Sequence, residues 1–185
     1  MRITVVGKGN VGGGLARRWE TAGHVVTALG RAGGDATGAD VVLVALPSAV
    51  IADGLAKVSG LGGQVTIDAT NTLGTYPAGY DSLAQQVKSI IGGPTAKAFN
   101  TNFAALYGQV DAEQVRPGTS FASDPEAREI TERLIRDAGF DPVYLGDLSQ
   151  ARLLESLIGV TMGVAQGGLG PFFYRFSRPG ELSVR

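Results

Sequence analysis

The feature that most constrains this chain is a run of β-branched residues that leads directly into a glycine-rich turn. Arg2 to Val6 read RITVV and predict a buried strand, and Gly7, Gly9 and Gly12 follow at once in the pattern Gly-x-Gly-x-x-Gly. Residues 11–22 then carry apolar side chains at helical spacing. A strand, a glycine turn and a helix in this order form a dinucleotide-binding unit, whose diphosphate lies at the helix N-terminus. We therefore expect dinucleotide binding, with a purely structural glycine turn as the alternative.

Composition narrows the class of protein. The chain has 185 residues, of which 44% are hydrophobic and 18% charged, as expected of one compact domain with a small appendage. A formal net charge of −1 provides no long-range attraction for nucleic acid or an anionic membrane, so neither partner is expected. The lack of cysteine excludes disulfides, thiolate catalysis and thiolate metal sites. With no leader and no apolar run of about 20 residues, a cytoplasmic protein is expected.

Further apolar segments alternate with helical patterns along the chain. Residues 39–47 form a continuous apolar run, which is typical of a parallel strand covered on both faces. The other expected strands are residues 24–29, 64–68, 96–100, 119–122 and 142–145, and the expected helices are residues 48–59, 81–91 and one that begins at 123 or 124. These segments predict an α/β fold of the Rossmann type, with a doubly wound, mostly parallel sheet and a C-terminal helical segment. We expect a nucleotide-binding domain over residues 1–148, followed by a helical segment over residues 149–185.

The ends of the expected strands identify the edge of the sheet that would bind a ligand. Ser48, Asn71 and Asn100 each follow a strand, and the glycine turn follows the first one. In open α/β sheets ligands bind outside the carboxyl ends of the strands. These polar residues and the glycine turn are therefore expected at one common site.

The residues after the second strand indicate which nicotinamide nucleotide is bound. An acidic residue at this place usually holds the ribose 2′-hydroxyl of NAD, whereas an arginine accommodates the 2′-phosphate of NADP. Here Gly30 and Arg31 follow the strand, and the first acid is Asp35. The pattern favours NADP(H), with Arg31 as a solvated surface charge being the alternative. Only about ten residues separate the second and third strands, near the lower limit for a crossover, so its helix is expected to be short or missing.

Few charged side chains are placed for catalysis. His24, the only histidine, is expected to be a solvated turn residue. Asp68 is expected to hold a backbone turn, with proton transfer as the alternative. Lys97 is expected to be solvated or to face a phosphate, with a catalytic role as the alternative. The sequence shows no recognisable catalytic triad and no cluster of metal ligands, so no catalytic residue and no metal site is predicted. Hydride transfer would suit such a site, because it depends mainly on positioning.

The last helical pattern is apolar around most of its circumference. Its side chains include Leu153, Leu157, Val160 and Val164, and a helix of this kind must be buried. Burial against a second copy of itself is the simplest solution, so a homodimer is expected. Four aromatic residues follow within residues 172–176 and are expected in core or interface packing, with a pocket for a flat heterocycle as the alternative.

Several segments together resemble the NADPH-dependent coenzyme F420 reductases and their relatives, which include the cytosolic domain of the membrane ferric reductases. The segments that carry the resemblance are GKGNVGGGLARRWETAGHVVTALGR, IDATNTL, KAFNTNFAAL, ASDPEAREITERLIRDAGFDPVYLGDL and ARLLESL, in the family's order and spacing. The resemblance implies a soluble NADP-binding enzyme, usually dimeric through a C-terminal helical segment. Such enzymes pass hydride between the nicotinamide and a deazaflavin or flavin.

The resemblance also implies roles for individual residues. The diphosphate would lie against Gly7, Lys8, Gly9, Asn10 and Val11, and the 2′-phosphate against Gly30 and Arg31. Ala45, Leu46 and Pro47 would border the ribose and nicotinamide, and Ala98, Asn100 and Thr101 would lie beside the carboxamide. The chain departs from the family in its short segment 30–40, and in Ser48, where the family often has a tryptophan.

Three functions follow from these observations. The first is an NADPH-dependent oxidoreductase that uses coenzyme F420 or a flavin as co-substrate. The second is an imine or small-carbonyl reductase of the same fold, which requires an acid near the substrate. The third is a protein that binds NADP(H) as a sensor without turnover.

Overall fold

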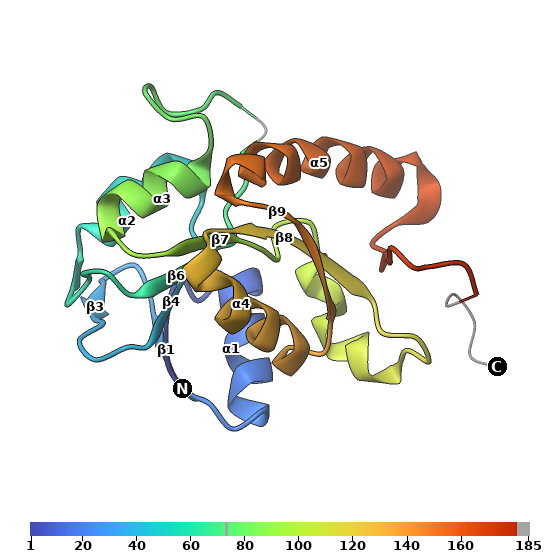
Figure 1. The fold of residues 1–185 in the computed structure, drawn as a ribbon, viewed down its shortest axis with the longest axis horizontal. Coiled ribbons are helices and arrows are strands. Elements are labelled where there is room, and N and C mark those ends of the chain that lie inside the picture. Colours follow the sequence, from blue (N-terminus) through green and yellow to red (C-terminus); the bar gives the residue numbers. More distant parts are fainter. Residues whose placement is uncertain (73, 181–185) are drawn as a thin grey trace.

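A central sheet organises the chain. In the computed structural model, which describes residues 1–72 and 74–180, seven strands of the described chain form one sheet in the order β2-β1-β4-β6-β7-β8-β9. All neighbouring strands are parallel except β7 and β8 (Figure 1). The strands are β1 (Arg2–Val6), β2 (Val25–Leu29), β4 (Val41–Val44), β6 (Val65–Asp68), β7 (Thr95–Lys97), β8 (Gly118–Ser123) and β9 (Asp141–Gly146).

Helices cover both faces of the sheet. On one face lie α1 (Asn10–Thr21) and α4 (Pro125–Asp137), and on the other lie α2 (Ile51–Leu55), α3 (Leu83–Ile91) and α5 (Ala151–Val164) (Figure 1). The expected α/β fold of the Rossmann type with a C-terminal helix is therefore confirmed.

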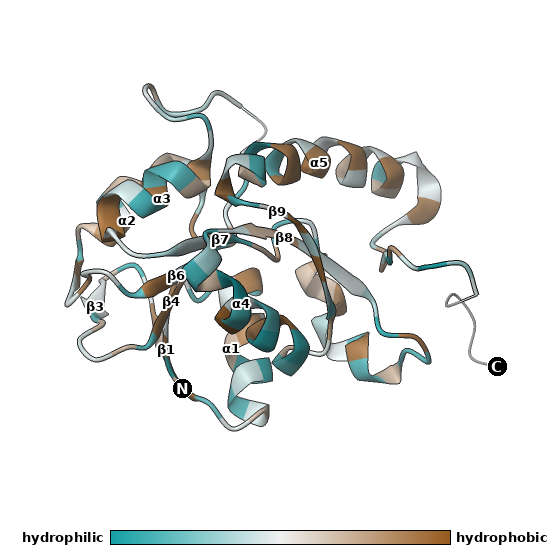
Figure 2. Ribbon diagram, in the orientation of Figure 1, coloured by the Kyte–Doolittle hydropathy of each residue, from teal (hydrophilic) through white to brown (hydrophobic). Residues whose placement is uncertain are grey.

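Strand β4 shows why the apolar run in the sequence is continuous. All four of its residues are fully buried, and they alternate between the two cores of the molecule. Val41 and Leu43 pack with α1 and α4, whereas Val42 and Val44 pack with α2 and α3. Figure 2 shows the same division, with hydrophobic residues concentrated along the inner strands and a largely hydrophilic outer surface on α4. Both faces of the sheet are therefore closed to water along β4.

Trp19 holds helix α1 against α4 and against Phe99, which follows β7. Its side chain is fully buried, and its indole Nε1 donates a hydrogen bond to the carbonyl oxygen of Leu134 at 2.8 Å. The ring packs edge-to-face on Phe99, with the two centroids 5.9 Å apart. This packing fixes the direction in which α1 leaves the glycine turn.

The connection from β2 to β4 contains no helix in the described residues, as its length predicted. Residues 34 and 35 form the short strand β3 (Gly34–Asp35), which pairs in parallel with β5 (Val58–Ser59) in a separate two-stranded sheet. The helix expected over residues 48–59 is shorter than predicted. It consists of a 3₁₀ turn, Ser48–Val50, followed by α2, because the chain must turn at residue 56 to form β5.

The prediction of His24 as a solvated residue was wrong. Its side chain is almost fully buried, and its Nε2 lies 2.9 Å from Oδ2 of Asp137 in the last turn of α4. Its Nδ1 lies 3.4 Å from the amino group of Met1. The histidine thus joins the start of β2 to the end of α4. This contact depends on the packing of α4 beside α1, which local sequence patterns do not show.

The C-terminal segment returns across the sheet. After α5 a π-helical turn, Ala165–Leu169, leads into an extended segment in which the carbonyl oxygen of Tyr174 accepts a hydrogen bond from Gly118 N at 2.7 Å. Residues 181–185 of the predicted C-terminal segment lie outside the described residues. Across the residues that are described, none of the helices has both the length and the apolar character needed to span a bilayer.

Candidate functional site

The glycine turn between β1 and α1 is built for close approach of a ligand. Gly7 has φ +104°, and a Cβ there would lie 2.3 Å from the carbonyl oxygen of Ala45. A Cβ on Gly12 would lie 1.8 Å from the carbonyl oxygen of Gly7, so both positions require glycine. A Cβ on Gly9, in contrast, would have no atom within 4 Å. The backbone at Gly9 therefore faces open space, where a diphosphate can approach it.

The first turn of α1 provides the electrostatic part of the same site. The helix begins at Asn10, and no side chain caps its N-terminus. Its first turn also contains no acidic residue. The unpaired N–H groups and the positive end of the helix dipole are therefore available to an anion.

A cavity of about 610 Å³ opens at the carboxyl ends of β1, β2 and β4. Its size is that of a small-molecule site. The predicted residues that line it are Gly7, Lys8, Gly9, Gly30, Arg31, Ala45, Leu46 and Pro47. Val6, Val50, Asp53, Gly54 and Lys57 complete the wall. Residues that are distant in the sequence thus meet at the edge of the sheet that the strand order predicts.

Three basic side chains surround the end of β2 in this cavity. Lys8 extends over Gly30, because a Cβ built on Gly30 would lie 2.9 Å from Cε of the lysine. Arg31 and Lys57 line the same cavity, and Asp53 is the one carboxylate among the described residues of its wall. The positive charges outnumber the negative one, which suits a phosphate group.

Lys57 was not predicted from the sequence. The short connection after β2 packs directly against it, since Gly34 N donates a hydrogen bond to the carbonyl oxygen of Lys57 at 3.2 Å. Gly33 has φ +78°, and a Cβ there would lie 2.0 Å from that same oxygen. The pairing of β3 with β5 places Lys57 at the cavity, and no local pattern around residue 57 indicates this pairing.

The first acid after β2, Asp35, is engaged away from the cavity. Its Oδ1 accepts hydrogen bonds from Thr37 N at 3.0 Å, Thr37 Oγ1 at 2.7 Å and Ser59 Oγ at 2.9 Å. The side-chain hydrogen bond from Thr37 is the main reason that the pKa of Asp35 lies below its ordinary value. The carboxylate does not line the cavity, and it links β3 to Ser59 of β5 instead.

A pair of asparagines follows β6 and β7. Asn71 Nδ2 donates to the carbonyl oxygen of Asn100 at 2.5 Å, and Asn100 Nδ2 donates to Asn71 Oδ1 at 3.0 Å and to the carbonyl oxygen of Leu154 at 2.8 Å. Asn100 Oδ1 is buried and has no hydrogen-bond partner within the described chain. An unsatisfied buried acceptor of this kind is costly, which makes this oxygen a candidate to receive a donor from a ligand.

The other predicted residues, like the two asparagines, do not line the cavity. Ala98 and Thr101 are buried, and Thr101 Oγ1 lies 2.6 Å from the hydroxyl of Tyr174. Phe99, between them, has φ +63°, the only positive φ of a non-glycine residue in the described chain. Such backbone strain is common at functional sites. The structure places the remaining predicted residues, Asn10, Val11, Gly12 and Ser48, at the starts of α1 and of the 3₁₀ turn, outside the cavity wall.

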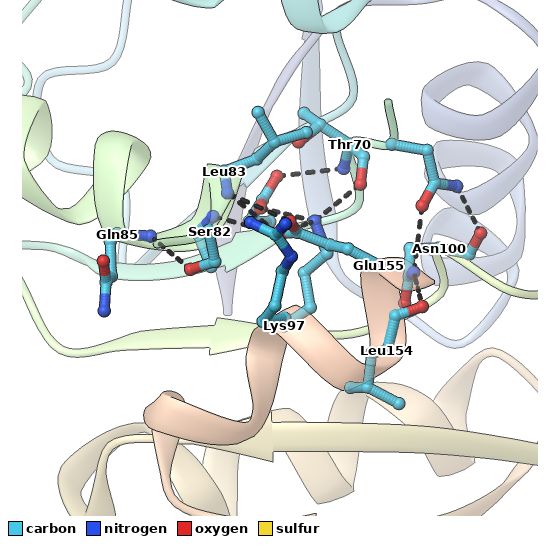
Figure 3. Close-up of polar contacts among 12 residues, drawn as sticks. Thr70, Ser82, Leu83, Gln85, Lys97, Asn100, Leu154 and Glu155 are labelled. Carbon is cyan, nitrogen blue, oxygen red and sulfur yellow. Dashed lines mark hydrogen bonds and ion pairs between the residues drawn. The ribbon is translucent and has the colours of Figure 1, made fainter. Parts of the chain in front are cut away.

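A buried ionic cluster lies behind the asparagine pair, and it corrects the prediction for Lys97 (Figure 3). Lys97 is fully buried. Its Nζ lies 2.8 Å from Asp68 Oδ2, 2.5 Å from the carbonyl oxygen of Thr70 and 3.0 Å from Glu155 Oε1. The ammonium therefore has a partner for each of its three protons and is neither solvated nor directed at a phosphate. The sequence analysis missed Glu155, its partner on α5.

The two carboxylates of the cluster each hold a piece of backbone. Asp68 Oδ1 accepts a hydrogen bond from Thr70 N at 2.9 Å, so Asp68 has the structural role that was expected. Glu155 accepts from Leu83 N at 3.0 Å and from Ala84 N at 3.3 Å. Glu155 thus caps the N-terminus of α3, where the helix dipole stabilises its negative charge. Through this residue α5 is joined to α3 and to the ends of β6 and β7.

Comparison with known proteins places the fold among known structures. No protein-family model and no curated protein sequence matches the chain. Among solved structures, a protein from Arthrobacter sp. FB24, provisionally named an F420-dependent NADP reductase, is 24% identical. The match covers 95% of this chain and 99% of that one, with a TM-score of 0.77. A hypothetical protein from Sinorhizobium meliloti is 26% identical over 80% of this chain and 86% of its own, with a TM-score of 0.65.

A reductive aminase from Aspergillus terreus, solved with NADPH and ethyl levulinate, is more distant. It is 18% identical, and the match covers 90% of this chain and 62% of the aminase, with a TM-score of 0.67. The chain therefore spans less than two thirds of that enzyme. These likenesses show that the chain shares its fold with these proteins.

The ionic cluster generates a stability prediction. Lys97→Met leaves two buried carboxylates without their cation and is expected to lower the free energy of unfolding by about 3–5 kcal/mol. Glu155→Gln keeps a hydrogen-bond acceptor at α3 and leaves Lys97 paired with Asp68, so a smaller loss of about 1–2 kcal/mol is expected. Both are measured by urea unfolding, followed by the fluorescence of the buried Trp19.

The matched control is Lys88→Met, because Lys88 pairs with Asp124 at 2.7 Å but its side chain is 44% exposed. An exposed pair contributes about 1 kcal/mol or less. Equal losses for Lys97→Met and Lys88→Met would contradict the importance of the buried cluster.

Proposed function

We propose that this protein is an NADP(H)-dependent oxidoreductase that transfers hydride between NADP(H) and a deazaflavin, coenzyme F420, or a flavin-type acceptor. The observation that carries the proposal is the cavity that joins the glycine turn to three basic side chains, Lys8, Arg31 and Lys57. Its glycine turn suits a diphosphate, and its cations suit a further phosphate on the adenosine ribose. The Arthrobacter protein of similar fold, with its provisional name, supports the same function.

The residues present fit the cofactor. The open backbone at Gly9 and the uncapped start of α1 would hold the diphosphate, and Arg31 with Lys57 would hold the 2′-phosphate. The nicotinamide would lie towards the asparagine pair. The unpartnered buried Oδ1 of Asn100 is an acceptor suited to the N–H₂ group of its carboxamide.

When bound, NADP(H) supplies the hydride, and the residues of the chain orient it and exclude water. Orientation alone accounts for several kcal/mol of a hydride-transfer barrier. Two partly buried rings, Phe103 and Phe172, lie with centroids 5.3 Å apart. Each ring is two residues away in the sequence from one member of the Thr101–Tyr174 pair. An aromatic wall of this kind favours a flat heterocyclic acceptor.

A second candidate function, reduction of an imine or a small carbonyl, is favoured by one observation. The hydroxyl of Tyr174 lies 2.6 Å from Thr101 Oγ1 and 3.3 Å from Ser120 N, close to the predicted carboxamide site. A tyrosine hydroxyl held in this way can donate a proton to a substrate, whereas Lys97 is fully engaged elsewhere. The fold of the Aspergillus reductive aminase is compatible with this function.

The cavity generates a prediction on nucleotide selectivity. Arg31→Ala and Lys57→Ala are each expected to weaken NADPH binding by about 1.5–3 kcal/mol, because each removes a charged contact to the 2′-phosphate. NADH affinity is expected to change by less than about 0.5 kcal/mol, as for a surface substitution. Titration calorimetry with both nucleotides measures the difference.

Asp53→Ala is the control within the same cavity, and it is expected to strengthen NADPH binding slightly by removing a negative charge. If Arg31→Ala weakened both nucleotides equally, the side chain would not contact the 2′-phosphate. If the unmodified protein bound neither nucleotide, the proposed function would be wrong.

Turnover separates the candidate functions. NADPH oxidation is followed with coenzyme F420, with riboflavin phosphate, with ferric chelates and with cyclic imines. For a deazaflavin or flavin acceptor, Tyr174→Phe is expected to change kcat by no more than about twofold, because the proton that accompanies the hydride can reach the ring nitrogen from solvent. For an imine substrate the same change is expected to lower kcat about 10²–10⁴-fold.

Tyr80→Phe is the matched control, since Tyr80 lies in the loop before α3 and its hydroxyl contacts only Ser89 Oγ within the described residues. Tight NADPH binding without turnover of any acceptor would favour the sensor function instead.

We also propose that the protein forms a homodimer through α5. Leu153, Val160 and Val164 lie on one face of this helix, and their side chains are exposed by 57%, 62% and 44% in the single chain. A row of exposed aliphatic residues on a long helix is typical of a surface that is covered by another chain. A second copy presents the same row and covers it symmetrically. Localisation in the cytoplasm stays a prediction.

The double variant Leu153→Asp/Val160→Asp is expected to be monomeric, because it would bury two charges in the interface. Analytical ultracentrifugation measures the mass of both proteins. Val25→Asp is the control, since Val25 is 67% exposed but lies on the opposite edge of the sheet at β2. A monomeric unmodified protein would contradict the proposal.

A further inference from the structure

A second cavity, of about 400 Å³, lies on the α1/α4 face of the molecule, at the end of α1 distant from the glycine turn. The last turns of α1, the end of α4 and the 3₁₀ segment Ala104–Ala112 contribute to its walls. It shares no lining residue with the nucleotide cavity. Whatever binds there is therefore separate from the proposed cofactor.

The charged side chains of this cavity are mainly basic. Its wall includes Arg17, Arg18, Arg116 and Arg136 and two carboxylates, Asp111 and Asp137. The cavity therefore concentrates positive charge in a chain whose formal net charge is −1. A concave surface of one sign raises the local concentration of ions of the opposite sign.

Two of the four arginines have acidic partners. Arg18 donates to both oxygens of Asp111, at 3.0 and 2.6 Å, and to the carbonyl oxygen of Tyr107 at 3.1 Å. Arg136 Nη2 lies 3.1 Å from Glu132 Oε2. The hydrogen bonds from Arg18 are the main reason that the pKa of Asp111 lies below its ordinary value, so this pair stays ionised.

The other two arginines, Arg17 and Arg116, have no carboxylate within 4.0 Å in the described part of the chain. Arg116 contributes only a longer-range attraction to Asp111. The helix dipole gives a structural reason for a positive charge at Arg18 and Arg136, because these residues lie in the last turns of α1 and α4. The dipole gives no such reason for the positive charge at Arg17, which precedes the last turn of α1, or at Arg116, which lies outside the helices.

We propose that this cavity binds a small phosphate compound with at least two negative charges, such as a phosphate monoester or a diphosphate. Two free guanidinium groups provide paired donors that match phosphate oxygens, and Arg18 is already held in place by its own bonds. The volume admits a compact ligand. This site does not depend on the proposed function, because the two cavities share no lining residue.

The experiment uses inorganic pyrophosphate as the probe and measures the modification of individual arginines by phenylglyoxal, with mass spectrometry of the peptides. Pyrophosphate at ten times its Kd is expected to slow modification of Arg17 and Arg116 about tenfold. Arg2 and Arg128, which are exposed elsewhere, serve as internal controls and are expected to react unchanged. Protection of Arg31 by NADPH tests the nucleotide cavity in the same samples.

Variants then locate the bound ion. In Arg17→Gln, pyrophosphate is expected to lose its protection of Arg116, whereas in the charge-matched Arg2→Gln that protection persists. Equal reactivity of Arg17 and Arg116 with and without pyrophosphate would overturn the proposal, as would equal protection of every exposed arginine. Failure of NADPH to protect Arg31 would instead count against the proposed function alone.

Discussion

The ion pairs of the Lys97 ammonium are the interactions on which the candidate functional site of this molecule depends. It joins the ends of β6 and β7 to α5, and through Glu155 it reaches the first turn of α3. A buried charge costs several kcal/mol unless its partners are correctly placed. β6, β7, α5 and α3 are therefore held in one arrangement. This arrangement also fixes the positions of Asn71 and Asn100, which follow β6 and β7. Because Glu155 contacts Lys97, α5 is bound to the sheet within one chain, in addition to the proposed dimer contact.

The parts of the fold that were predictable are those that local periodicity determines. RITVV followed by Gly7, Gly9 and Gly12 predicted the first strand and helix, and the apolar run of β4 predicted a strand covered on both faces. These patterns depend on neighbours within one element. They also predicted that the glycine turn and the residues after β2 and β4 meet at one edge of the sheet, where these residues line the larger of the two cavities described above.

The parts that were not predictable depend on partners far apart in the sequence. His24 contacts Asp137 across 113 positions, and Glu155 reaches Leu83 across 72. The sequence around a single titratable residue does not indicate a distant partner of this kind. The general rule that such residues are solvated therefore gives the wrong prediction for these buried side chains. Lys57 is a further example, since its place at the cavity follows from a two-residue pairing of β3 with β5. The antiparallel direction of β8 was likewise not indicated by its short apolar run.

The reversal of β8 supports the segment that follows β7. Lys97, the last residue of β7, pairs with Ala122, so residues 118–121 of β8 extend past the end of β7. At about 3.3 Å per residue, these four residues continue the sheet roughly 13 Å further. Asn102 Nδ2 donates to the carbonyl oxygen of Gly118 at 3.0 Å, and Tyr174 contacts Gly118 and Ser120. The backbone around Asn100 is therefore held by both β8 and the C-terminal segment, so loss of the C-terminal segment would loosen the asparagine pair without removing either of its members.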